Sequence, residues 1–476
     1  MEKLEKNKIA AKLLLLFVVL PTPAYAYLDP GTGSMLVSLF IGIAASLYFT
    51  LKNVYYSLSQ GVLSAFGLKL KRRGRLSIVF YSEGGQYWKT FQPVVSELID
   101  RRTACTYFTQ DRNDPGLKLN APYYSGEFIG VGNRGYARMN YLEADICVMT
   151  TPGLDVLQIK RSKGVRHYVH LVHAPTDMAT YKLFSFDYYD SVFISGPHQR
   201  RSLRLLEEQR GTRPKRICEV GCTYYDEMVK ELRSSEAKST DSSSTPTVLV
   251  APTWGKNGLL KRFGEKILIP LAKGGFRVIV RPHPQSYLSE RDMLKTLEKS
   301  LREYGNLTWS REPDGLSVMS QADILLSDLS GIVFDFAFLF FKPVITLQFP
   351  LEKRGAESNN LPYDPWELGV LHTIGRQISQ SDIPKIDTIA SDCLKRESHE
   401  ETIRNVRDCS VYNFGKAAAT AADRLLEIAE SIESGSISPS PATHREKASG
   451  EKHRLPSIKE PNGQMGEVIF DLPTVE

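Results

Sequence analysis

Short apolar segments alternate with helical patterns along most of the chain beyond residue 75. Each apolar segment ends at glycine, proline or small polar residues, as strands buried in a parallel sheet do. In the first half the segments are 76–81, 105–108, 145–149, 165–171, 191–195 and 217–220. In the second half they are 248–251, 276–280, 307–309, 324–326 and 344–347. The alternation predicts an α/β fold with two Rossmann-like domains and a cleft between them.

Residues 322–347 show the pattern most clearly. The strand 324–326 is followed by the small and polar residues 327–331, and then by an apolar stretch that predicts a buried helix. Ligands bind at the carboxyl ends of strands in open α/β sheets, and the N–H groups of Ser330 and Gly331 would begin the helix there. Asp335 lies one turn into that helix. A plain helix cap, with Asp335 hydrogen-bonded inside the core, fits the same residues.

The amino-acid composition divides the rest of the chain into two domains, a linker between them and a tail. Residues 234–247 are rich in serine and predict a linker between a first domain, 76–233, and a second domain, 248–432. Residues 417–431 predict a closing helix. The tail 433–476 is rich in Ser, Pro, Lys and Glu, and we expect it to be disordered.

The amino-terminal region predicts a membrane anchor. Residues 1–26 have a basic head, a short apolar middle and an Ala-Tyr-Ala exit, so they form a signal-like or first membrane segment. Within 27–75, residues 34–51 are 18 residues without a charge, enough to span a bilayer, and a basic cluster follows at 69–75. We therefore expect an inner (plasma) membrane protein whose large domain faces the cytoplasm. A secreted protein fits only the first 26 residues.

Several partner classes are not expected. The net charge of +6 includes no basic stripe interleaved with aromatic residues, so nucleic acid is not an expected partner. The six cysteines are scattered without a CxxC pair, which suits a reducing compartment. His167, His170 and His173 recur every third residue, but a strand points such positions to opposite faces. No Asp-x-Asp motif occurs either, and we expect neither a metal nor a cofactor.

Four polar turns follow predicted strands. They are 172–176 with His173, 252–256 with Thr253 and Trp254, 281–284 with Arg281 and His283, and 327–331. A histidine at a strand tip suits general-base work because its ordinary pKa of ~6.5 is near neutral. A guanidinium and an imidazole held between prolines suit a phosphate or pyrophosphate. The alternatives are a packed histidine in the first turn and a surface ion pair in the third.

Together these residues resemble the CDP-glycerol glycerophosphotransferase family, which includes teichoic-acid primases and polymerases. The resemblance rests on A-P-T-W at 251–254, R-P-H-P at 281–284, S-D-L-S-G-I-V-F-D-F at 327–336 and N-F-G-K-A-A at 413–418. It implies a two-domain GT-B fold and transfer of glycerol phosphate from CDP-glycerol to a glycan or lipid-linked acceptor, with release of CMP. It also implies His173 and His283 as the catalytic pair. The implied substrate-binding residues are Ala174, Pro175, Thr176, Thr253, Trp254, Arg281, Pro282, Asp328, Ser330, Gly331 and Asp335.

Two positions depart from the family pattern. The usual H-G-T-P reads His173-Ala174-Pro175-Thr176 here, and the usual G-x-P-R-x-D reads G-C-T-Y-Y-D at 221–226, without its arginine. These departures leave room for a GT-B nucleotide-sugar glycosyltransferase or epimerase acting in surface polysaccharide synthesis. A non-catalytic, membrane-tethered scaffold is the third reading. The joint presence of His173, Arg281, His283, Ser330 and Asp335 argues against a scaffold, which needs none of them.

Overall fold

The computed structural model describes residues 75–236, 245–312, 315–348, 353–395 and 399–436. The predicted membrane segments, most of the serine-rich linker and nearly all of the predicted tail lie outside these residues. In the part of the chain that the structure describes, no helix has the length and apolar character needed to cross a membrane.

The first domain is built on a seven-stranded sheet whose neighbouring strands all pair in parallel. The strand order is β3-β2-β1-β4-β5-β6-β7, so the order reverses direction between β1 and β4. The strands are β1 (Leu76–Ser82), β2 (Cys105–Thr109), β3 (Tyr124–Phe128), β4 (Ala144–Met149), β5 (Val165–Leu171), β6 (Ser191–Ile194) and β7 (Arg216–Glu219). Its helices are α3 (Trp88–Asp100), α4 (Asn133–Asn140), α5 (Pro197–Arg210) and α6 (Thr223–Glu236).

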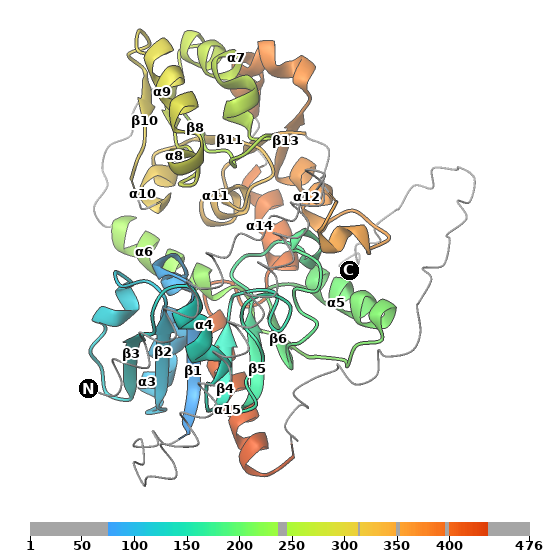
Figure 1. Ribbon diagram of the computed structural model, residues 1–476. Coiled ribbons are helices and arrows are strands. Elements are labelled where there is room, and N and C mark those ends of the chain that lie inside the picture. The colour runs from blue at the N-terminus through green and yellow to red at the C-terminus, as the bar shows by residue number, and fades with distance from the viewer. Residues whose placement is uncertain (1–74, 237–244, 313–314, 349–352, 396–398, 437–476) are drawn as a thin grey trace, which may run out of the picture. The chain divides into compact units, whose positions relative to one another are not determined.

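The second domain has a six-stranded parallel sheet with the order β10-β9-β8-β11-β12-β13. The strands are β8 (Thr247–Val250), β9 (Arg277–Val280), β10 (Leu307–Trp309), β11 (Ile324–Ser327), β12 (Val344–Leu347) and β13 (Gly375–Ile378). The helices are α7 (Leu259–Lys273), α8 (Ser286–Ser289), α9 (Arg291–Ser300), α10 (Gly315–Ser320), α11 (Ile332–Phe340), α12 (Trp366–Ile374), α13 (Ile386–Leu394) and α14 (His399–Ser410). Figure 1 shows the two sheets, blue to green and yellow to orange.

The central strands and α3 form because their apolar side chains have a core to enter. Strands β8, β11 and β12 are buried along their whole length, as strands covered on both faces must be. Helix α3 is amphipathic and buries Trp88, Phe91, Val94, Val95 and Leu98. These elements match the sequence prediction to within a residue or two.

Two edge strands were missed by the sequence analysis. β3 has the sequence Y-S-G-E-F and β13 has G-R-Q-I, and both sequences are largely polar. Their pairing with β2 and β12 is a tertiary property. Neither strand contains an apolar run from which it could have been predicted.

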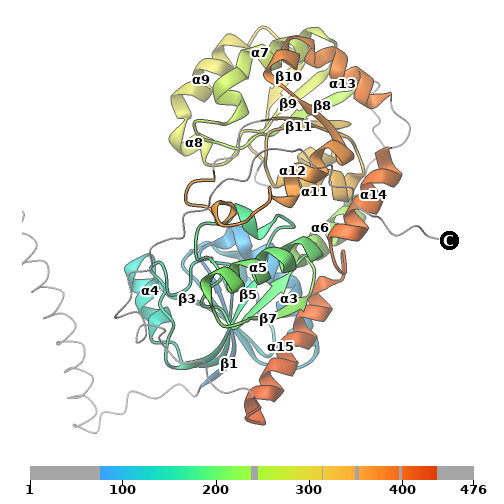
Figure 2. The ribbon, with the colours of Figure 1, turned by 90° about the vertical axis from the view of Figure 1, so that its right-hand side faces the viewer.

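The last helix, α15 (Ala417–Glu433), crosses back to the first domain. Its buried face, including Ala421, Leu425 and Ile428, joins the same core as β1 and α3. Figures 1 and 2 both show this red helix beside the first sheet. The sequence predicts this helix as part of the second domain, 248–432, whereas its apolar stripe packs on the first domain. Chain order alone does not say which of two sheets a terminal helix covers.

Two glycines allow the chain before α15 to pass close to the first domain. Tyr412 donates its backbone N–H to Ser195 O at 2.8 Å, so the chain before α15 passes close to the ends of β6 and β7. A Cβ at Gly196 would lie 1.8 Å from Ser410 O, and one at Gly221 would lie 2.2 Å from Tyr412 O. Gly221 also has φ +101°, which side chains disfavour.

Candidate active site

The loops after β8 and β11 meet at the point where the order of the second sheet reverses. Asp328, just after β11, is 1% exposed. Its Oδ1 accepts the Thr253 N–H at 2.7 Å, and its Oδ2 accepts the Leu259 N–H at 3.0 Å. Burial raises the pKa of Asp328, and these two hydrogen bonds work against that rise. Both oxygens therefore hold the 252–258 loop in place, so its observed role is to shape the loop.

The predicted phosphate-binding residues lie at this same edge. His283 and the half-exposed Trp254 have ring centroids 6.4 Å apart, which brings the turns after β8 and β9 together. His283 Nδ1 accepts the Gln285 N–H at 3.1 Å, so its Nε2 carries the proton in the neutral ring. Pro282 is buried, and Arg281 Nη1 donates to Glu312 O at 2.6 Å. Partial burial lowers the pKa of His283.

Ser330 and Gly331 lie directly before α11, as the sequence predicts. The helix runs nine residues, so its first turn presents N–H groups and a positive dipole end at this edge. Asp335 interacts with Tyr225 and Cys222, which lie at and just before the start of α6. Burial raises the pKa of Asp335 to about 7. Asp335 thus points toward the junction with α6.

His173 lies at the carboxyl end of β5 in the first domain. Its ring packs edge-on against Tyr87 and Tyr181, with centroids 5.4 and 6.5 Å away. Its Nδ1 is buried without a hydrogen-bond partner in the described part of the chain. Burial lowers the pKa of His173 to about 4, so the ring is neutral at pH 7. A neutral imidazole can accept a proton.

The turn after His173 is held by its backbone. Gln199 Nε2 donates to Thr176 O at 2.7 Å, and His198 Nε2 contacts Pro175 O at 2.8 Å. The Ala174 carbonyl accepts from Ser195 Oγ at 3.3 Å. The carbonyls of this turn face α5, which leaves the Thr176 side chain to face the other way, into a cavity described next.

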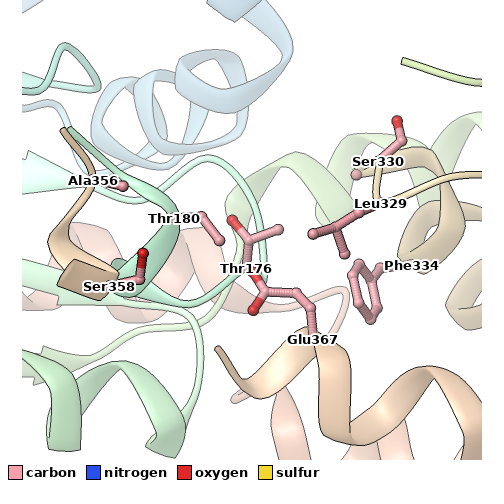
Figure 3. Close-up of a pocket in the computed structure, with 9 residues that line it drawn as sticks. Thr176, Thr180, Leu329, Ser330, Phe334, Ala356, Ser358 and Glu367 are labelled. Atoms are coloured by element: carbon pink, nitrogen blue, oxygen red, sulfur yellow. The ribbon is translucent and has the colours of Figure 1, made fainter. Parts of the chain in front are cut away.

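A cavity of about 220 Å³ lies between the two domains. Its lining joins residues from the turn after β5, the start of α11, the loop before α12, and α12 itself: Thr176, Thr180, Leu329, Ser330, Gly331, Phe334, Ala356, Ser358 and Glu367. Figure 3 shows Glu367 and Thr176 reaching toward the same space from opposite domains. Of the predicted site residues, the cavity brings together Thr176, Ser330 and Gly331. The predicted catalytic histidines and Thr253, Trp254, Arg281 and Asp335 do not line it.

Glu367 was missed by the sequence analysis. It is 1% exposed, and its Oε1 accepts the Asp177 N–H at 2.7 Å across the domain junction. Asp177 in return accepts the Trp366 N–H at 3.1 Å through Oδ2. Burial, and then the neighbouring Asp177, raise the pKa of Glu367 to about 7. The only local signal was a glutamate on an otherwise apolar helix turn, W-E-L-G-V-L.

No cluster of three or more His, Cys, Asp or Glu side chains suited to a metal ion occurs among the described residues. Within β5, His167 Nε2 contacts Ser191 Oγ at 2.7 Å, while His170 is buried among Phe186, Tyr189 and Tyr181. The two rings have separate surroundings.

Comparison with known proteins relates part of the chain to one enzyme family. Residues 174–361 match the family described as CDP-Glycerol:Poly(glycerophosphate) glycerophosphotransferase. Over these residues the chain is similar to the CDP-glycerol glycerophosphotransferases. The matched region contains the turns after β8, β9 and β11, and stops just before Glu367. No curated protein sequence matches the chain.

Solved structures show the fold of this chain. A structure of the wall teichoic acid polymerase TagF with CDPG is similar at TM-score 0.50 and 15% identity, covering 83% of this chain and 99% of that one. A putative UDP-N-acetylglucosamine 2-epimerase from Listeria monocytogenes is similar at TM-score 0.51 and 10% identity, covering 76% of this chain and 98% of that one. At such identities the likeness concerns the GT-B-like fold alone: two parallel α/β domains that face each other.

Proposed function

We propose that the enzyme transfers glycerol phosphate from CDP-glycerol to a hydroxyl group of a cell-surface glycan or lipid-linked acceptor and releases CMP. The family match over residues 174–361 carries this proposal. The position of Thr253, Arg281, His283, Ser330 and Gly331 at the carboxyl edge of one sheet supports it, since ligands of open α/β sheets bind there.

The proposed transfer requires a base for the acceptor hydroxyl group and groups that stabilise negative charge on the phosphates. The acceptor oxygen attacks the β-phosphorus of CDP-glycerol, the bond from that phosphorus to the CMP oxygen breaks, and CMP leaves with the electron pair. His173 takes the proton of the attacking hydroxyl group. Negative charge grows on the pyrophosphate and on the departing CMP. The Arg281 guanidinium, the Nε2–H of the neutral His283 ring and the first turn of α11 are the groups available to stabilise it.

Nucleotide binding tests the donor. In calorimetry on the full chain in detergent, we expect CDP-glycerol and CMP to bind and a panel of UDP-sugars not to bind. His283→Ala should weaken both ligands, whereas His372→Ala, an exposed histidine on α12, should leave both unchanged. Binding of a UDP-sugar alone would replace the proposed function by a nucleotide-sugar enzyme, a reading that the absent arginine at Tyr224 leaves open.

The membrane anchor belongs to the same proposal. An uncharged run at 34–51 and a basic cluster at 69–75 support an inner-membrane protein with its domains in the cytoplasm. We expect the full chain to sediment with membranes and to be cleaved by protease only after the inner membrane is opened. A chain lacking residues 1–74 should stay in the supernatant; its complete retention on membranes would contradict this anchor.

A further inference from the structure

One oxygen of Glu367 has no partner in the described protein. Oε1 is taken by the Asp177 N–H, but Oε2 is buried without a hydrogen bond. An unsatisfied buried carboxyl oxygen is costly, so proteins rarely leave one unless a ligand or water completes it. Glu367 is one of the residues that line the cavity, so a ligand held in the cavity is the partner that we consider for this oxygen.

The neighbouring acid cannot supply the missing hydrogen bond. Asp177 is 1% exposed, and its Oδ1 already accepts from Ala179 N–H at 3.1 Å and Ser202 Oγ at 2.5 Å. Its Oδ2 accepts the Trp366 N–H. Asp177 thus fixes the position of α12, while the free Oε2 of Glu367 remains available to a ligand.

The two ends of the cavity have opposite electrostatic character. Ser330 and Gly331 bring the positive end of the α11 dipole to one wall, and Glu367 brings a carboxyl group to another. Leu329 and Phe334 supply an apolar surface, while Thr176 and Ser358 supply hydroxyl groups. An anion at one end and hydroxyl groups at the other describe a polyol phosphate.

The size of the cavity points to the same fragment. At about 220 Å³ it is smaller than the ~300–1,000 Å³ typical of pockets for drug-sized ligands. A complete nucleotide donor therefore does not fit inside it, but a three-carbon polyol with one phosphate is a small enough part. The cytidine would remain outside, toward the loops that carry Trp254 and His283.

We propose that this cavity holds the polyol phosphate end of the donor, with its phosphate at the α11 N-terminus and a polyol hydroxyl group donating to Glu367 Oε2. Glu367 is then the residue that distinguishes a hydroxylated donor from a nucleotide without its polyol. The inference rests on the proposed function and adds to it a specificity residue outside the matched family region.

The titratable groups near Glu367 are few. Asp177 and Tyr181 interact with it electrostatically, and His198, stacked on Trp366 at 4.3 Å, interacts with Asp177. Burial keeps the pKa of His198 low, at about 4, and that of Tyr181 above its ordinary range, so both rings stay neutral near pH 7. Of Glu367, His198 and Tyr181, only Glu367 has a pKa near neutral pH, because burial raises it to about 7.

The decisive experiment compares CDP-glycerol with CDP on the full chain by calorimetry. Glu367→Gln has nearly the same volume and can still accept the Asp177 N–H, but it presents an amide N–H₂ where the hydroxyl group needs an acceptor. We expect CDP-glycerol to bind roughly 10- to 100-fold more weakly to this variant, with CDP affinity unchanged. The affinity of wild type for CDP-glycerol should also rise with pH through about 7, because the ionised carboxylate is the stronger acceptor, and the variant should lose that rise.

Control variants separate specificity from folding. Lys353→Ala removes an exposed ion pair on the segment before α12 and does not line the cavity, so it should leave the ratio of the two affinities unchanged. If Glu367→Gln does not fold, Ser358→Ala, which removes a lining hydroxyl group, should reduce that ratio instead. A folded Glu367→Gln that keeps the full preference for CDP-glycerol overturns the role of Glu367 alone. Wild type that binds neither ligand overturns the proposed function, and this inference with it.

Discussion

At the residue scale, His173 shows how burial prepares a side chain for chemistry. Tyr87 and Tyr181 enclose its ring at the tip of β5 and lower its pKa from 6.5 to about 4. A histidine in water is half protonated near pH 6.5, and only its neutral form can accept a proton. The buried ring instead stays neutral over the whole physiological range, which suits a general base.

The pH dependence of activity follows from that shift. A base works when deprotonated, and the pKa of His173 in the folded protein is below 6.5, so the acid limb of kcat/KM should lie well below pH 6.5. His173→Ala should lower kcat by at least ~100-fold, the usual contribution of general-base catalysis, with an unchanged circular-dichroism spectrum. His372→Ala is the control. An acid limb at 6.5, or near-normal turnover without His173, would contradict the role of this histidine as the base.

At the element scale, two motifs far apart in the sequence meet at the start of α15. Asp226 lies on α6, within the G-C-T-Y-Y-D stretch, and α15 follows the N-F-G-K stretch. The Asp226 carboxylate accepts the Ala417 N–H at 3.0 Å and the Ala418 N–H at 2.6 Å. One helix therefore supplies the N-terminal cap of another, which ties the returning α15 to the first domain.

Removing this cap should destabilise the protein. Asp226→Ala leaves two helix N–H groups without their acceptor, and we expect a loss of about 1–2 kcal/mol in the free energy of unfolding. Urea unfolding followed by circular dichroism measures it. Asp423→Ala on α15 removes an exposed pair with Arg101 and should cost no more than ~1 kcal/mol. Equal losses of unfolding free energy in the two variants would show that the cap stabilises the protein no more than an exposed ion pair does.

At the scale of the whole molecule, residues 353–367 of the second domain bind along the first domain. Leu183 N–H donates to Gly355 O at 3.1 Å, and Glu357 N–H donates to Tyr181 O at 2.8 Å. The Glu357 side chain is fully buried and pairs with Arg210, which also pairs with Asp187 at 2.7 Å. This segment ends at Glu367, so the same contacts that join the domains also place the carboxyl group in the cavity.

Breaking the buried ion pair should uncouple the domains. Glu357→Ala leaves Arg210 with only one of its two acid partners in a site where it is 11% exposed, and removal of one member of a buried pair costs about 3–5 kcal/mol. Differential scanning calorimetry should show a lower transition or two separate ones. Lys353→Ala, which removes an exposed pair with Asp364 on the same segment, should change stability by less than ~1 kcal/mol. A Glu357→Ala protein as stable as Lys353→Ala would contradict a structural role for the buried pair.

The sequence alone determined the elements that carry their own signal. Buried central strands such as β8 and β12 are apolar runs, and α3 has an apolar stripe, so their positions could be read directly. The turns with His173, Arg281 and Ser330 could be found because each follows such a strand. Parallel strands align their carboxyl ends, which is why local patterns located one edge of each sheet.

Only the tertiary structure decided which of these groups meet. Edge strands β3 and β13 have largely polar sequences, so they carry no local signal, and only their pairing with β2 and β12 makes them strands. The two Asp328 oxygens accept N–H groups of the loop after β8, a contact between segments about 70 residues apart that no local pattern predicts. Glu367 became a site residue only because a hydrogen bond between residues 190 positions apart holds α12 against Asp177. Burial and long-range hydrogen bonding are properties of the folded chain, and they set the chemistry of the cavity.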